Sequence, residues 1–141
     1  MSQLLFINWN NKDLTGYSII DEQHRGLIAT INSLYYFIQQ GWDLQSLKPT
    51  ILMLEQYMVF HLKTEESILA SINIPEETME AIREYREIFL QELHDIVTDA
   101  IISDKPHELS KFLAKWWQGH KTEFHEKLQV YFDSCPSKLN Q

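Results

Sequence analysis

Metal-binding side chains interrupt the apolar faces of several helix-like segments along the chain. His61 and Glu65 are four residues apart, so a helix directs an imidazole and a carboxylate toward the same side from adjacent turns. His24 follows Ile20 by four residues and precedes Leu27 by three, which places it on an apolar face as well. These three side chains are therefore expected inside the protein, where each needs a polar partner.

The C-terminal part of the chain supplies two more histidines. His120 follows Trp116 by four residues and precedes Phe124 by four, so it also points inward. His125 comes five residues after His120, which is about 140° around a helix and reaches the other edge of the apolar face. Two side chains at that spacing can contact a group at the centre of the bundle from two sides.

Together these side chains indicate a shared metal site. A single buried histidine is usually a structural residue with one hydrogen-bonded partner, but four histidines and a glutamate left unpaired would be costly to bury. A divalent cation satisfies them together, and this donor set suits iron, zinc or manganese. His107 is instead expected to be exposed, and His94 is expected at the surface or partly buried. The predicted metal ligands are His24, His61, Glu65, His120 and His125.

Four helices must position these groups. Apolar residues recur at helical spacing over residues 18–41, 44–71, 75–102 and 106–133, and short breaks that contain proline separate the last three segments. Ser18 or Asp21 is expected to cap the first helix. Loops this short favour an all-α, antiparallel up-down-up-down four-helix bundle. A single domain, 1–141, is expected, with an N-terminal arm over 1–17, the bundle over 18–133 and a tail over 134–141.

Composition narrows the classes of partner. The chain has 141 residues and a net charge of −8, which disfavours nucleic acid and anionic membranes as partners. Cys135 is the only cysteine, so packing rather than a disulfide must hold the fold, as is typical of a reducing cytoplasm. The sequence indicates no signal peptide and no membrane span. It identifies no protein partner.

Three motifs carry a resemblance to a known family. They are Trp9 and Gly16 followed by Ile20-Asp21-Glu22-Gln23-His24, then Tyr57-x-x-x-His61-Leu62-x-x-Glu65-Glu66, and finally Trp116-Trp117-x-x-His120. In this order and spacing the chain resembles the bacterial hemerythrins over the whole domain. That resemblance implies a four-helix bundle whose core holds two irons, liganded by five histidines, one glutamate and one aspartate, and which binds dioxygen.

The resemblance also assigns roles to individual residues. His24 and His61 match ligands of the iron that does not bind dioxygen, Glu65 matches a bridging carboxylate, and His120 matches one ligand of the other iron. On the third helix the family has two histidines, but this chain has Ile82 and Arg86.

His125 stands where the family has its bridging aspartate, and Leu62, Trp117 and Lys121 also depart from the family pattern. The dioxygen-binding iron therefore loses two of its three histidines. We predict that Arg86 takes the place of that metal and pairs with Glu65, directly or through water. The alternative is that Arg86 extends to solvent and touches nothing.

Three functions follow as hypotheses. The first is a non-enzymatic, hemerythrin-like protein that binds one metal ion, iron before zinc or manganese, for sensing or metal handling, with a small diatomic molecule as a further ligand. The second is a di-iron dioxygen-binding protein that uses substitute ligands, namely Glu84, Tyr85 or Glu87. The third is a metal-free helical interaction module with exposed contacts at Trp42 or Trp117.

Overall fold

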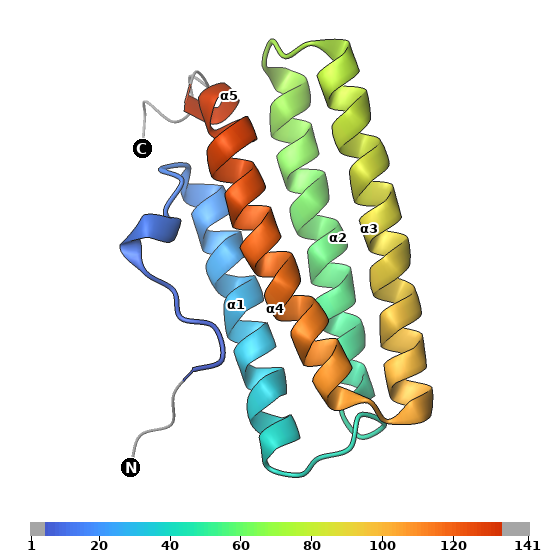
Figure 1. Cartoon of the computed structure of the whole chain (residues 1–141). Coiled ribbons are helices and arrows are strands. Elements are labelled where there is room, and N and C mark those ends of the chain that lie inside the picture. The colour runs from blue at the N-terminus through green and yellow to red at the C-terminus, as the bar shows by residue number, and fades with distance from the viewer. Residues whose placement is uncertain (1–4, 134–141) are drawn as a thin grey trace.

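The computed structural model describes residues 5–133, apart from the side chain of His125, and every regular element in that range is helical (Figure 1). A short 3-10 helix, η1, comes first. The four long helices, α1 to α4, follow, and a π-helical turn, η2, lies between α4 and the short helix α5. Their bounds are η1 Asn11–Asp13, α1 Ser18–Gln39, α2 Lys48–Ser71, α3 Glu76–Ser103, α4 Pro106–Glu123, η2 Phe124–Leu128 and α5 Gln129–Asp133. The predicted all-α class is confirmed. Cys135 and the predicted tail, 134–141, lie outside the described residues.

The ends of the first two long helices differ in detail from prediction. Tyr17 occupies the N-cap of α1 without a side-chain cap. Asp21 instead accepts hydrogen bonds from the backbone N–H groups of Thr15 and Gly16, so it fixes the segment before the helix. The second helix begins at Lys48 rather than 44, and Pro49 lies in its first turn, where a missing N–H costs nothing.

The expected unbroken fourth helix, 106–133, contains a π turn. The five residues of η2 follow α4 directly, and α5 continues the same path. A π turn takes an extra residue, so it rotates the side chains that follow it about the helix axis. After this rotation Leu128 and Phe132 lie buried in one cluster with Phe124.

The four long helices pack against one another as a bundle. α1 contacts α2 and α4, and α3 also contacts α2 and α4. In Figure 1 their axes run side by side, with the α1–α2 and α3–α4 connections at one end and the α2–α3 connection at the other. Gly26 permits the close approach of α1 and α2, because a Cβ there would lie 2.3 Å from the Tyr57 hydroxyl. Among residues 5–133, no helix combines the length and apolarity that a membrane crossing requires.

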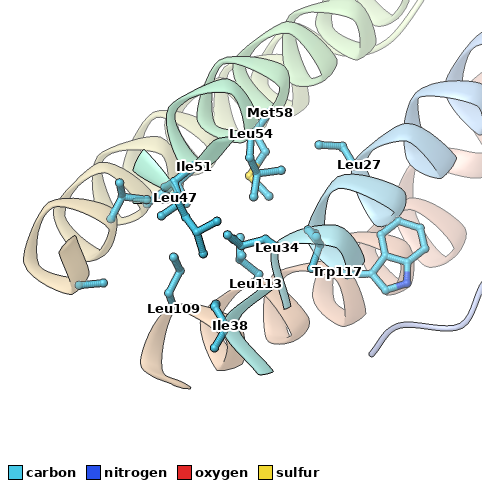
Figure 2. Close-up of a cluster of buried hydrophobic side chains, with 14 of the residues drawn as sticks. Leu27, Leu34, Ile38, Leu47, Ile51, Leu54, Met58, Leu109, Leu113 and Trp117 are labelled. Atoms are coloured by element: carbon cyan, nitrogen blue, oxygen red, sulfur yellow. The ribbon is translucent and has the colours of Figure 1, made fainter. Parts of the chain in front are cut away.

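The buried core is divided into two apolar clusters. The larger fills one end of the bundle and includes Leu93. Figure 2 labels other members of this cluster, among them Leu27, Met58 and Trp117. The smaller includes Ile20, Leu69, Ile82 and Phe124. In each of the four long helices, buried polar residues lie in sequence between members of the two clusters. They include His24 in α1, His61 and Glu65 in α2, Arg86 in α3 and His120 in α4. A polar layer therefore separates the two halves of the core.

Candidate metal centre

Four of the five predicted ligands meet in this polar layer. His24 comes from α1, His61 and Glu65 from α2, and His120 from α4, and all four are buried. One donor atom from each lies within 4.8 Å of the others, so the group can hold a metal ion. His125 belongs to η2, and its side chain lies outside the described part of the chain, so its role as a ligand stays a prediction.

The donor atoms are spaced as ligands of one ion would be. Glu65 Oε2 lies 2.9 Å from His61 Nε2, 3.1 Å from His120 Nε2 and 3.5 Å from His24 Nε2. His120 Nε2 is 3.2 Å from the Nε2 atoms of both His61 and His24. Metal–donor bonds of about 2.0–2.2 Å place neighbouring ligands about 2.9–3.5 Å apart in tetrahedral and octahedral geometries. The residues therefore fit a single metal ion.

A chain of hydrogen bonds fixes which nitrogen of His61 carries its proton. The Thr64 hydroxyl donates to the Phe60 carbonyl, at 3.0 Å, so it accepts from Gln23 Nε2, at 3.2 Å. This sets the orientation of the Gln23 amide, whose Oε1 faces His61 Nδ1 at 2.9 Å. An amide oxygen can only accept, so Nδ1 donates and the neutral imidazole has a lone pair on Nε2.

The same assignment leaves a position between His61 and Glu65 that a proton or a metal ion can occupy. The His61 Nε2 lone pair points at an oxygen of the Glu65 carboxylate, and neither atom brings a hydrogen to the contact. Two acceptor atoms 2.9 Å apart and fully buried repel each other unless a proton or a metal ion lies between them. Histidines that bind metals characteristically donate their other N–H to a protein oxygen, as His61 does to Gln23.

Arg86 occupies the other side of Glu65. The residue is 4% exposed, Nη2 donates to Glu65 Oε1, and Nη1 donates to the Leu62 carbonyl at 3.0 Å. The prediction that Arg86 pairs with Glu65 rather than reaching solvent is confirmed. Because Oε1 is engaged by the guanidinium, only Oε2 is left to face the histidines. Ile82, one turn earlier in α3, is also buried, so the predicted inward register of these two positions is correct.

Two tryptophan rings of α4 pack against histidines of the site. The Trp116 ring stacks on His120, with centroids 4.9 Å apart, and Trp117 meets His24 edge to face at 5.1 Å. Trp117 is 2% exposed, so its predicted role as a surface contact is wrong, because the ring covers the site. Trp42 is 51% exposed, as that hypothesis requires.

Five other residues that the sequence singled out lie at the surface. His107 is exposed, as predicted, and His94, which was expected at the surface or partly buried, is exposed as well. Glu84, Tyr85 and Glu87, the substitute ligands of the di-iron hypothesis, are exposed too and do not join the buried group. Gln23 was missed as a partner of the site. Its place beside His24 in the first motif gave a signal, but a glutamine next to a ligand is not by itself recognisable as a hydrogen-bond acceptor.

Burial and mutual charge set the protonation of the group. Burial lowers the pKa of His120 to about 4, although Glu65 opposes the shift, and burial also lowers the pKa of His24. Burial alone would raise the pKa of Glu65, but His120 and His61 outweigh it and hold that pKa well below its usual range. The folded metal-free site therefore favours neutral imidazoles at His24 and His120 and an ionised Glu65 carboxylate, which are the protonation states that bind metals.

A pH dependence of stability follows for the metal-free protein. His120 takes up a proton near pH 6.5 when unfolded but only near pH 4 when folded, so acidification favours the unfolded chain. Between pH 7 and pH 5 this histidine alone should lower the free energy of unfolding by about 2 kcal/mol, at up to about 1.4 kcal/mol per pH unit. Urea titrations of chelator-treated protein measure the slope, which should become shallower in His120→Gln. An unfolding free energy that is flat over this range would contradict the expectation.

Comparisons with models of known protein families, with curated proteins and with solved structures find no match to this chain. The function must therefore be argued from the geometry of the site.

Proposed function

We propose that the protein binds one divalent metal ion, iron before zinc or manganese, through His24, His61, Glu65 and His120. The observation that carries the proposal is the contact between His61 Nε2 and Glu65 Oε2, where two acceptor atoms face each other at 2.9 Å with a tautomer fixed by Gln23. Three imidazoles and one carboxylate form a donor set that suits these metals.

The proposed stoichiometry rests on Arg86. A carboxylate bridges two ions by giving one oxygen to each, but Glu65 Oε1 already accepts from the guanidinium. A second ion on that side would also meet a buried positive charge instead of donor atoms. We therefore propose a hemerythrin-like up-down-up-down bundle, with an N-terminal arm, whose centre holds one ion where that family holds two.

The proposed role is sensing or metal handling rather than enzymatic turnover. A bound iron ion would supply one-electron chemistry and affinity for small ligands. Four protein donors are fewer than the six that octahedral metal ions take, which supports a small diatomic molecule, or His125, as a further ligand. The protein's own contribution is a buried site, held by the relay from Thr64 through Gln23 to His61.

Metal content per chain tests the proposal. Untagged protein should contain about one equivalent of metal, and His61→Ala and Glu65→Ala should each contain almost none, because each removes a donor from the centre. His94→Ala is the matched control, since His94 forms a similar histidine–glutamate pair with Glu55 at the surface, at 3.0 Å. Two equivalents in the unaltered protein would overturn the single-ion site, and equal metal content in all variants would overturn the ligand assignment.

The second candidate is a metal-free interaction module, which the Arg86–Glu65 pair favours because it neutralises the buried carboxylate without any metal. The two candidates differ in their response to a chelator. A metal present at a thousand times its dissociation constant stabilises the fold by about 4 kcal/mol, so its removal should lower the melting temperature by several degrees. An unchanged melting temperature would instead favour the metal-free module.

A further inference from the structure

An open groove of about 750 Å³ runs between α3 and α4. Its volume lies in the range of sites that bind small organic molecules. The inner part of the groove reaches His120 and Arg86, and its outer part is lined by aromatic and charged side chains. The groove is a separate feature from the buried ligand group, although the two share His120.

Aromatic rings line the groove in an ordered stack. Phe112 stacks on Phe89 with ring centroids 5.8 Å apart, Phe89 stacks on Trp116 at 5.8 Å, and Trp116 stacks on His120 at 4.9 Å. Tyr85 lies on the same groove and is 63% exposed. Within the part of the chain that the structure describes, Tyr85 stacks on no other ring. It therefore offers an aromatic face that the protein itself does not use.

Gly119 keeps part of the groove wide. It lies inside α4, where glycine disfavours the helix relative to alanine. No neighbouring atom explains the absence of a side chain, because a Cβ at this position would meet nothing within 4 Å. Gly119 lines the groove, so the missing side chain leaves space for a molecule from outside the chain.

The charges around the groove balance. Three cationic and three acidic side chains line it, namely Arg86, Lys115, Lys127, Glu92, Glu123 and Glu126. Arg86 is already paired with Glu65, which leaves two cationic and three acidic side chains along the groove. Neither an anion nor a cation finds a large surplus of opposite charge here, so charge complementarity favours an uncharged ligand.

We propose that the α3–α4 groove binds a small, uncharged molecule with a planar aromatic ring, which packs beside Tyr85 and Trp116 and over Gly119. Flat rings gain from offset stacking on exposed aromatic faces, and the unfilled volume above Gly119 accommodates a ring without rearrangement. This binding site goes beyond the proposed metal function and does not depend on it.

β-Naphthol is a suitable probe, with β-naphthoate and β-naphthylmethylammonium as its anionic and cationic counterparts. Calorimetry on the full, metal-loaded chain should show β-naphthol binding with a dissociation constant on the order of 0.1 mM, and both charged probes should bind more weakly. Gly119→Leu should weaken β-naphthol binding at least about tenfold, because the side chain fills the groove, whereas Gly119→Ala should change it less than about twofold.

Both Gly119 variants should fold, so weaker binding in one of them would not reflect a loss of structure. Leucine and alanine both favour the helix over glycine, so the two variants should melt at least as high as the unaltered protein. Tyr85→Ala should weaken binding about three- to tenfold, and Tyr36→Ala, an exposed tyrosine on α1, should leave it unchanged.

The proposal is overturned if β-naphthol does not bind at about 1 mM, if a charged probe binds more tightly, or if binding is the same in Gly119→Leu. The metal proposal can fail separately from this one. In His61→Ala, which should lose the metal, β-naphthol should still bind, because His61 does not line the groove.

Discussion

Glu65→Gln should lower the free energy of unfolding of the metal-free protein by about 3–5 kcal/mol. Glutamine preserves the shape of the side chain but removes its negative charge, which leaves the Arg86 guanidinium buried at 4% exposure without an anionic partner. Stranding a buried charge costs more than losing an ion pair at the surface. The substitution should also remove the metal, but chelator in all samples isolates the effect on folding. Urea unfolding followed by circular dichroism measures it.

A double variant separates the stranded charge from other causes. Glu65→Gln combined with Arg86→Met removes both charges and should recover most of the loss, since an apolar side chain of similar length replaces the guanidinium. Asp99→Asn is the matched control, because Asp99 pairs with Lys105 at 3.5 Å on the surface and should cost less than about 1 kcal/mol. A cost for Glu65→Gln no larger than that of Asp99→Asn would show that Arg86 does not depend on the carboxylate.

The helices and most of the site could be predicted because both depend on one periodicity. Spacing of three or four residues decides which side chains face the core, so the apolar stripes and the inward placement of His24, His61, Glu65 and His120 follow from the same rule. The partner of Arg86 was predicted from the family resemblance, which placed Arg86 where a metal ligand of the family stands and therefore near Glu65. A guanidinium on a buried face must also find an acceptor, and Glu65 provides it.

Features that depend on three-dimensional detail could not be predicted in this way. α2 begins at Lys48 rather than at the predicted residue 44. Leu44 and Leu47 are buried, but they belong to a turn and not to the helix, and apolar spacing does not distinguish the two. The π turn over η2 changes the register by one residue, and no residue type in Phe124–Leu128 marks it. The groove beside Gly119 depends on how two helices pack, which a single helical pattern does not contain.

The change with the largest expected effect on metal stoichiometry is the triple variant Ile82→His, Arg86→His and His125→Asp. Ile82 and Arg86 are both buried on the inward side of α3, and Arg86 touches Glu65 directly. Histidine at position 86 would free Glu65 Oε1 and replace a buried cation with a donor. Histidine at position 82 would add a second donor, and aspartate at position 125 would supply the second carboxylate that the family resemblance places there.

Metal content should therefore rise from about one to about two equivalents per chain, because Glu65 could then give one oxygen to each of two ions. The control is Ile82→Ala, Arg86→Ala and His125→Asp, which removes the guanidinium without adding imidazoles and should stay near one equivalent. That comparison distinguishes a lack of donor atoms from simple repulsion by Arg86. If the histidine variant also stays near one equivalent while remaining folded, α3 does not face a second metal position, and the single-ion character of the site has a cause other than Ile82 and Arg86.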